Sequence, residues 1–393
     1  MPPLGSRKIF VVGIGGAGMS AYALLAHAWG AEVAGWDRND TPYAERVRAA
    51  GIPVTISAEP EALDGWEVFV SSAYAYPGSS RAELLAELVS LRRSIVVSGT
   101  HGKTTTAGMI AFCLKRLGRD PAFLIGGEIP QLGGNAGAGE GCLVVEGDES
   151  DRTVERLRPE IAVVTNVELD HHTTFGSQAE LEDMFESWLG HVPNAVRGWE
   201  LGPATMELLV PGEHNRRNAA CALAALELAG IDPGEATAAL AEFRGVGRRF
   251  ELVGEPRGIA VYDDYAHHPS EVDAAIAAAR EASSGRVLAA FQPHLYSRTR
   301  HLAREFARAL AGADVVCVTE IYAAREDPVE GVTGKLVVDA VTEARPGVPV
   351  GWTPSLDDAV AFVAARAEPG DLAVTIGAGD IDVAARRLVE VLG

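Results

Sequence analysis

Residues 98–106 read Ser-Gly-Thr-His-Gly-Lys-Thr-Thr-Thr, and they constrain the fold more than any other stretch of the chain. A β-branched run, residues 95–97, precedes them, and the helical pattern of residues 107–114 follows. Strand, glycine-bearing loop and helix in this order form the setting that a phosphate-binding loop needs. Gly99 and Gly102 allow backbone N–H groups to turn inward around phosphate oxygens, and the helix N-terminus adds a favourable dipole.

Two side chains of this loop carry the expected chemistry. Lys103 is placed to reach the β- and γ-phosphates of a nucleotide, and the hydroxyl of Thr104 is placed to ligate Mg²⁺. The loop is shorter than a standard Walker A sequence, because two residues rather than four separate its glycines. The alternative is a glycine turn that a lysine and a threonine follow by chance.

Composition predicts a soluble globular protein rather than a membrane-spanning or nucleic-acid-binding one. The 393 residues are enough for two or three domains; 47% are hydrophobic and 22% are charged. The net charge of −20 argues against a polyanion-binding surface. No apolar run is long enough to span a membrane and no signal peptide is evident, so we expect a cytoplasmic protein. The cysteines lie in separate apolar segments, which indicates buried free thiols: Cys113, Cys142, Cys221 and Cys317.

Strands and helices alternate along the chain, which is the pattern of α/β domains with mainly parallel sheets. We expect strands at 8–12, 32–36, 68–72, 143–145, 161–165, 260–262, 287–291, 315–318 and 372–376. We expect helices at 17–29, 81–91 and 217–229, and a loop over 190–213. The predicted domains are residues 1–93, residues 94–244 with the phosphate loop, and residues 245–393.

A second glycine loop, Gly13–Ser20, follows the first predicted strand and opens the first helix. Asp37 ends the next strand, where a ribose-binding acid would stand. NAD, FAD and UDP-sugar sites all use such a loop, because each presents a pyrophosphate to a helix N-terminus. Tight packing of strand on helix, with no ligand, is the alternative.

Acidic and histidine residues follow two strands of the central domain. Glu146–Asp151 ends one strand and Asn166–His172 ends the next. Carboxylates at strand ends beside a phosphate loop suit Mg²⁺, and His171 is a candidate metal ligand. A solvated acidic loop and a structural histidine pair are the alternatives.

Further polar groups stand at helix starts and strand ends. In His214–Asn218, Asn215 is a candidate helix cap and Asn218 a candidate contact for a nucleotide base. In the third domain polar and aromatic residues follow two strands, at 262–269 and 291–299, where α/β folds place ligands. Arg248 and Arg249 open this domain and suit a phosphate or carboxylate.

Together these motifs resemble the Mur ligases of peptidoglycan synthesis, and the resemblance covers nearly the whole chain. The matching segments, in order, are 13–20, 99–106, 146–151, 166–171, 214–218, 247–251, 263–271, 291–300, 323–328 and 331–334. The resemblance is greatest to the branch that joins L-alanine to UDP-N-acetylmuramate. It implies an α/β fold of three domains: a Rossmann-like N-terminal domain that binds the UDP-sugar, a P-loop-type central ATPase domain, and a Rossmann-like C-terminal domain.

The resemblance also implies a reaction and its residues. ATP phosphorylates the muramate carboxylate, and the amine of alanine attacks the resulting acyl phosphate. Catalytic roles fall to Lys103, His171, His294 and Arg298. ATP contacts fall to Gly99, Thr100, His101, Gly102, Lys103, Thr104, Thr105, Asn218 and Arg249. Mg²⁺ ligands are Thr104, Glu146 and His171. Substrate contacts are Gly15, Gly16, Gly18, Met19, Ser20, Asp37, Tyr265 and His267.

The chain departs from this family at three places. The segment between Ala73 and the helix at 81–91 is short, the central domain lacks a stretch between residues 189 and 211, and Leu295 stands where many relatives have arginine. Sister ligases that use a carbamylated central lysine are disfavoured, since the lysine after Lys115 is Lys335. The expected partners are UDP-N-acetylmuramate and L-alanine, without nucleic acid or membrane, in a monomer or homodimer.

Four other functions stay open at this point. A ligase that adds a recycled peptide to UDP-N-acetylmuramate would use the same motifs. An NAD-dependent oxidoreductase would use the first glycine loop but leave the phosphate loop without a role. A metal-dependent phosphohydrolase would rest on the two histidine pairs, residues 171–172 and 267–268. A non-catalytic relative would fit the shortened segments.

Overall fold

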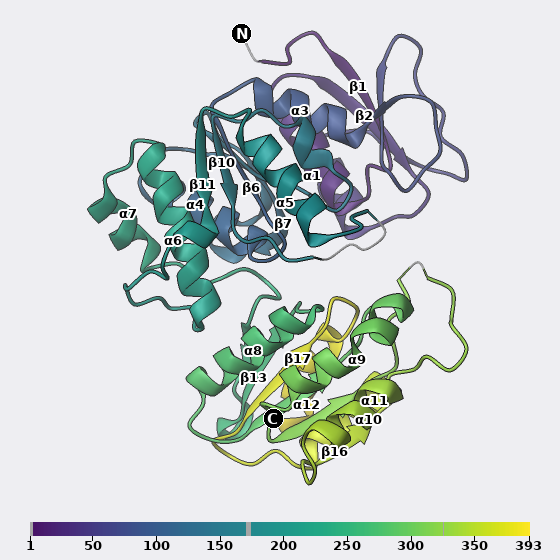
Figure 1. The fold of residues 1–393 in the computed structure, drawn as a ribbon. Coiled ribbons are helices and arrows are strands. Elements are labelled where there is room, and N and C mark those ends of the chain that lie inside the picture. Colours follow the sequence, from purple (N-terminus) through teal and green to yellow (C-terminus); the bar gives the residue numbers. More distant parts are fainter. Residues whose placement is uncertain (1–2, 170–173, 325) are drawn as a thin grey trace. The chain divides into compact units, whose positions relative to one another are not determined.

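The computed structural model describes residues 3–169, 174–324 and 326–393, and it contains three β-sheets flanked by helices (Figure 1). The chain divides into two compact units. The first comprises residues 1–208 and 216–244, and the second comprises residues 209–215 and 245–393. The predicted α/β class with parallel sheets is confirmed.

The first sheet has five parallel strands in the order β3-β2-β1-β4-β5. Its strands are β1 (Lys8–Val12), β2 (Glu32–Asp37), β3 (Val54–Ile56), β4 (Glu67–Val70) and β5 (Ser79–Ser80). Its helices are α1 (Ala17–Ala28), α2 (Pro42–Ala49) and α3 (Arg81–Ser90). The strand order reverses at β1, and such a switch point is where open α/β sheets bind ligands. The first glycine loop leaves β1 at this point.

The second sheet has six strands in the order β11-β10-β6-β9-β7-β8. Its strands are β6 (Ser94–Ser98), β7 (Ala122–Ile129), β8 (Gly134–Ala138), β9 (Leu143–Glu146), β10 (Ile161–Val164) and β11 (Asn194–Arg197). Its helices are α4 (Lys103–Arg116), α5 (Gln178–Leu189), α6 (Glu213–Leu228) and α7 (Pro233–Leu240). Among the described strands of this sheet, β8 alone runs antiparallel to its neighbour. The phosphate loop leaves β6, whose five residues are all buried.

The first two sheets share one hydrophobic core. Trp29 after α1 and Leu88 of α3 belong to the same cluster of buried side chains as Val145 of β9 and Phe185 of α5. Residue 93, where we predicted a domain boundary, therefore lies between two sheets that pack as one unit. The three domain ranges stay a prediction.

The third sheet forms the second unit, with six strands in the order β12-β13-β17-β14-β15-β16. Its strands are β12 (Glu251–Gly254), β13 (Ala260–Asp264), β14 (Val287–Phe291), β15 (Val315–Val318), β16 (Val350–Trp352) and β17 (Leu372–Ile376). Its helices are α8 (Pro269–Ala282), α9 (Tyr296–Leu310), α10 (Lys335–Ala344), α11 (Leu356–Ala364) and α12 (Asp382–Leu392). Apolar side chains of α8, α9 and α10 fill the core on one face, and those of α11 and α12 fill the core on the other.

Two local predictions were wrong. The predicted loop over 190–213 contains β11, which pairs in parallel with β10. Helix α6 begins at Glu213 rather than near residue 217, so Asn215 lies inside its first turn and is not its cap. The Asn215 side chain instead donates to the carbonyl oxygen of Pro211 at 2.7 Å. Within the described ranges no helix is long and apolar enough to cross a membrane.

Candidate active site

The phosphate loop connects β6 to α4 through two glycines with positive φ. The φ angles are +123° at Gly99 and +79° at Gly102. A β-carbon at Gly99 would lie 2.3 Å from Thr165 Oγ1, and one at Gly102 would lie 2.2 Å from Asn218 Oδ1. Both positions therefore require glycine for conformation and for space. The structure brings Asn218, a predicted ATP contact, against this loop.

Lys103 begins α4, and its ammonium group is enclosed by the loop. Nζ donates to the carbonyl oxygens of Gly99 at 2.7 Å and Thr100 at 3.0 Å, and it lies 2.9 Å from Glu149 Oε2. The Glu149 side chain is only 2% exposed. Burial alone would lower the pKa of Lys103, but the negative charges of Glu149 and Glu146 outweigh burial and raise this pKa. Lys103 is therefore a fixed positive charge in the loop.

Thr104 and Glu146 form the oxygen pair predicted to hold Mg²⁺. Thr104 Oγ1 donates to Glu146 Oε1 at 2.9 Å, and the backbone N–H of Gly126 donates to Glu146 Oε2 at 2.6 Å. A hydroxyl and a carboxylate are hard oxygen donors of the kind that Mg²⁺ binds. These residues fit the predicted metal. His171, the third predicted ligand, lies outside the described residues.

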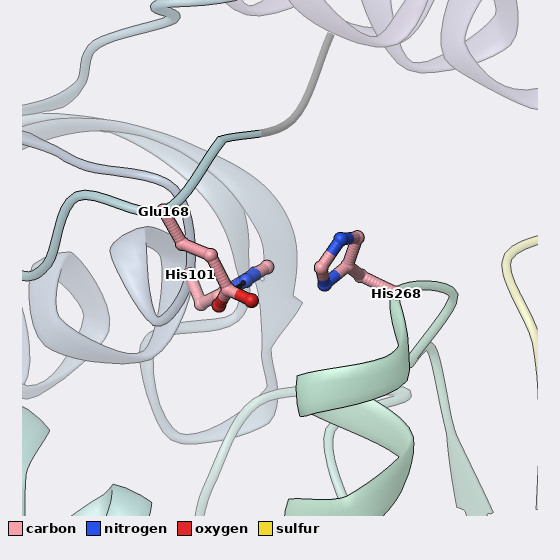
Figure 2. Close-up of side chains that lie close together, drawn as sticks. All are labelled: His101, Glu168 and His268. Atoms are coloured by element: carbon pink, nitrogen blue, oxygen red, sulfur yellow. Dashed lines mark hydrogen bonds and ion pairs between the residues drawn. The ribbon is translucent and has the colours of Figure 1, made fainter. Parts of the chain in front are cut away.

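His101 is tied to the strand end that follows β10. Its backbone N–H donates to Asn166 Oδ1 at 2.9 Å, and its carbonyl oxygen accepts from Thr165 Oγ1 at 2.6 Å. Its ring Nε2 lies 3.0 Å from Glu168 Oε2, and Figure 2 shows these two side chains pointing toward one another. These contacts fix the phosphate loop at its centre. Thr105, also a predicted ATP contact, is 7% exposed within α4.

The first glycine loop exposes only part of its predicted site. Residues 16–18 are exposed at the start of α1, whereas Met19 and Ser20 are each 3% exposed. The Ser20 hydroxyl donates to the carbonyl oxygen of Ala17 at 3.0 Å. A β-carbon at Gly16 would meet its nearest neighbour at 3.4 Å, an ordinary contact. A ligand therefore has access to this loop at residues 16–18.

Asp37 has an internal role in the structure. Its Oδ2 accepts from the N–H of Gly15 at 2.8 Å, and its Oδ1 accepts from the Tyr74 hydroxyl at 2.9 Å and the N–H of Asn39 at 3.2 Å. The side chain is buried against the glycine loop. Asp37 thereby holds the loop in shape, and its predicted contact with substrate stays a prediction.

The second unit gathers aromatic rings at the carboxyl ends of β13 and β14. The ring of His267 lies 5.5 Å from that of Tyr265 and 5.8 Å from that of His294. The ring of Tyr322 stacks on His294 at 5.7 Å. Three of these residues, Tyr265, His267 and His294, were predicted to meet in one site, and the structure brings them together.

Three arginines border these rings. The guanidinium carbons of Arg249 and Arg248 lie 4.9 Å and 5.1 Å from the ring centre of Tyr265. Nη1 of Arg298 lies 3.4 Å from Nδ1 of His294. Such flat cations beside aromatic rings are suited to a carboxylate or phosphate ligand. The cluster has the chemistry that we predicted for the third domain.

The surroundings of His267 favour its neutral form, because they lower its pKa. Burial lowers its pKa, and the nearby positive charge of Arg298 lowers it further, although Glu271 acts in the opposite direction. Its Nδ1 lies 3.0 Å from the carbonyl oxygen of Tyr265 and 3.3 Å from Glu271 Oε2. A neutral imidazole at this position is able to accept or donate a hydrogen bond without adding charge.

Leu295 links this cluster to α9 through an unusual backbone conformation. Its φ is +71°, in the region that favours glycine. Its N–H donates to the carbonyl oxygen of Tyr322 at 3.0 Å, and its own carbonyl oxygen accepts from the Thr299 hydroxyl at 2.8 Å. These bonds hold His294 beside Tyr322, so the backbone of residue 295 has a structural role here.

Asp264 makes the stability of the second unit depend on pH. Its carboxylate is buried, with Oδ2 accepting from the N–H of Phe250 at 2.8 Å and Oδ1 from the N–H of Ala266 at 2.7 Å. Burial raises the pKa of Asp264 to about 7. An unfolded aspartate titrates at about pH 4. Between about pH 4 and pH 7 the native state therefore holds a proton that the unfolded state has lost. The contribution of this group to stability is present below about pH 4 and is lost as pH rises to about 7.

We therefore expect the free energy of unfolding to fall more steeply with pH in the natural protein than in Asp264→Asn. One proton corresponds to a slope of at most about 1.4 kcal/mol per pH unit. Urea denaturation at several pH values between about 4 and 8 measures both slopes. Asp339→Asn, at an exposed position of α10 where the carboxylate pairs with Lys335, is the control for the loss of a surface carboxylate. Equal slopes for Asp264→Asn and the natural protein would contradict the raised pKa.

Several residues of these sites were not singled out from sequence. Glu149 lies inside the predicted acidic run, but within that run only Glu146 was predicted as a Mg²⁺ ligand. Tyr322 follows β15, and its position after a strand was the available signal. Arg81, which contacts the acidic run, begins a predicted helix and carries no motif.

Comparison with known proteins places all three sheets in one family. The Mur ligase family catalytic domain matches residues 8–93, the Mur ligase middle domain matches residues 97–196, and the Mur ligase glutamate ligase domain matches residues 248–379. The chain belongs to the Mur ligase family.

Individual relatives are similar over nearly their whole length. A UDP-N-acetylmuramate–L-alanine ligase from Rubrobacter xylanophilus is 39% identical, with 97% of this chain and 99% of that protein covered. One from Thermobifida fusca is 38% identical, with 98% and 97% covered. The crystal structure of UDP-N-acetylmuramate–alanine ligase from Thermotoga maritima has a TM-score of 0.80 and 28% identity, with 98% of each chain covered. A murein peptide ligase from Psychrobacter arcticus has the same fold, with a TM-score of 0.63 and 24% identity over 99% of each chain.

The alignments also show that this chain is shorter than some of its relatives. The match to the same ligase of a Mycobacterium species (strain JLS) runs over 472 positions and takes in 100% of this chain of 393 residues. That relative therefore carries segments that this chain lacks.

Proposed function

We propose that this chain joins L-alanine to UDP-N-acetylmuramate with conversion of ATP to ADP and phosphate, the reaction for which its similar relatives are named. The proposal rests on one observation above others: Lys103, Thr104 and Glu146 are assembled around a phosphate loop. This assembly lies in a chain that is 39% identical over nearly its full length to a ligase of that name. Family membership supports an ATP-dependent amide-bond ligase, and the choice of L-alanine belongs to the proposal.

The residues of the first unit are assigned to phosphoryl transfer. A carboxylate oxygen of the muramate attacks the γ-phosphorus of ATP, ADP departs, and an acyl phosphate remains. Lys103 neutralises charge on the transferred group, and donors fixed before the reaction contribute most because they need no reorganisation. Thr104 and Glu146 would hold Mg²⁺, which neutralises phosphate charge when bound. His171 stays a proposed third ligand.

The residues of the second unit are assigned to the amino acid. The α-amine of L-alanine attacks the acyl carbon, and phosphate leaves with the C–O bonding pair. Arg298 suits the alanine carboxylate, because a guanidinium binds carboxylates through paired hydrogen bonds. His267 and His294 are proposed to position the amine. Arg249 stays a proposed ATP contact.

The glycine loop of the first sheet is assigned to the diphosphate of the UDP-sugar. Residues 16–18 are exposed at the N-terminus of α1, at the switch point of the sheet. Backbone N–H groups at such a terminus attract phosphate oxygens.

The test is formation of ADP with UDP-N-acetylmuramate and each of L-alanine, glycine, L-serine and an L-alanyl tripeptide. We expect L-alanine to give the highest kcat/KM, with little ADP formed when either the UDP-sugar or the amino acid is omitted. A preference for the tripeptide would identify a peptide-adding ligase instead. ADP release from ATP alone, unchanged by either co-substrate, would identify a phosphohydrolase. Absence of turnover with intact ligand binding would indicate a non-catalytic relative.

A further inference from the structure

Arg81 lies between the acidic run and the first glycine loop. It is the first residue of α3, and the capping box of Ser80 and Glu83 fixes the start of that helix. Nη2 of Arg81 donates to Asp148 Oδ2 at 3.0 Å and to Asp151 Oδ2 at 2.9 Å. One guanidinium group thus contacts two carboxylates of the second sheet from a helix of the first.

The other side of the same guanidinium group lies near α1. Its Nη1 is 3.9 Å from the place where a β-carbon would stand at Gly18. Its Nε is buried and has no hydrogen-bond partner among the described residues. A buried charged donor without a partner is costly, because the lost contact with water is not replaced. Arg81 therefore has donor capacity that its two acidic contacts do not use.

The acidic run, residues 146–151, contacts the phosphate loop as well as Arg81. Glu146 binds the Thr104 hydroxyl, and Glu149 binds the ammonium group of Lys103. The negative charge of Asp148 contributes to the raised pKa of Lys103. Two carboxylates of this short segment thus contact Arg81, and the other two contact the phosphate loop. A movement of the acidic run at Arg81 therefore alters the electrostatic field at the phosphate loop.

We infer that Arg81 is a positioning residue that couples UDP-sugar binding at the first glycine loop to ATP binding at the phosphate loop. This inference rests on the proposed function. A diphosphate on the loop competes with Asp148 and Asp151 for the guanidinium group, since all three are anions within its reach. As Arg81 shifts toward the diphosphate, Asp148 and Asp151 lose their contacts with its guanidinium group. Lys103 and Thr104 then bind ATP phosphates with a different affinity.

The energetic content of this coupling is reciprocal. If UDP-N-acetylmuramate changes the affinity for ATP by some factor, ATP changes the affinity for UDP-N-acetylmuramate by the same factor. Coupling between sites in proteins typically amounts to about 5- to 150-fold. If Arg81 only stabilised the fold, replacing it would lower the stability of the protein and would leave the coupling factor unchanged.

The experiment measures the dissociation constant of a non-hydrolysable ATP analogue, with Mg²⁺, with and without saturating UDP-N-acetylmuramate. The variants are Arg81→Lys, which keeps the charge but loses the planar fork, and Asp151→Asn, which removes one acidic contact. Arg7→Lys is the matched control, because Arg7 also bridges two carboxylates, Glu67 and Glu87, at the far end of α3. Thermal unfolding checks that each variant is folded.

We expect a coupling factor of at least about fivefold in the natural protein and in Arg7→Lys, falling toward one in Arg81→Lys and to an intermediate value in Asp151→Asn. Both ligands still bind each variant. A factor of one in the natural protein, or an unchanged factor in folded Arg81→Lys, overturns the inference while the proposed function stands. If the natural protein binds ATP but not UDP-N-acetylmuramate, the proposed function itself fails.

Discussion

Replacing Lys103 by alanine is expected to lower the rate of ligation by about 10²- to 10³-fold, the cost of losing one preorganised charge at the transferred group. Nζ is held by Gly99, Thr100 and Glu149 in the position from which it would meet the nucleotide phosphates. Water cannot reproduce a fixed charge of this kind. The measurement is the initial rate of phosphate release with saturating UDP-N-acetylmuramate, L-alanine and ATP.

Glu149 supplies the control for this experiment. Without Lys103, the buried carboxylate of Glu149 loses the ammonium group 2.9 Å away, and losing one partner of a buried ion pair costs about 3–5 kcal/mol of stability. The double variant Lys103→Ala/Glu149→Gln removes that charge, so we expect its stability to recover and its activity to stay low. Near-natural turnover in the folded double variant would contradict the role of Lys103.

Most of the fold was predictable because its elements carry their own signals. The buried strand β14 is an uninterrupted apolar run, β17 is apolar except for Thr375, and the ends of both match the predicted residues. Helix α3 begins at Arg81 as predicted, where a serine cap and a glutamate three residues later form a capping box. Repetition of such units along the chain indicates parallel sheets.

The elements that were not predicted lack a local signal. β7 contains the pair Gly126-Gly127 and extends into an antiparallel hairpin with β8. β11 is four residues long and is stabilised by pairing with β10 rather than by its own pattern. Short edge strands of this kind depend on neighbours far away in the sequence, so a pattern of period two does not reveal them.

The sites were predictable to the extent that their residues lie within one motif. Lys103, Thr104 and Glu146 lie close together in the structure, as predicted, because they stand at the carboxyl ends of two neighbouring parallel strands, β6 and β9. Their roles stay a prediction. Glu149 and Arg81 were missed because their importance arises from contacts between segments. Asp37 was expected at a ligand, yet its oxygens accept hydrogen bonds from Gly15 of the first glycine loop and from the Tyr74 hydroxyl.

Gly102 offers the second large effect, which is a loss of ATP binding caused by a single methyl group. Its φ is +79°, and a β-carbon there would lie 2.2 Å from Asn218 Oδ1. Alanine in this conformation costs about 1–2 kcal/mol whatever surrounds it. In addition, either Asn218 or the loop backbone must move. Because both are predicted to contact ATP, we expect Gly102→Ala to weaken ATP binding by at least about tenfold, equivalent to about 1.4 kcal/mol.

Gly118, just beyond the other end of α4, separates the two causes. Its φ is +69°, and nothing among the described residues lies within 4 Å of its added β-carbon. Gly118→Ala therefore pays the same conformational cost without a collision, and we expect it to lose stability but to bind ATP normally. Calorimetric titration with ATP and thermal unfolding of both variants give the comparison. Equal ATP affinities in the two variants would show that the space beside Asn218 does not matter to the nucleotide. A loss confined to Gly102→Ala would place the nucleotide against this turn of the chain.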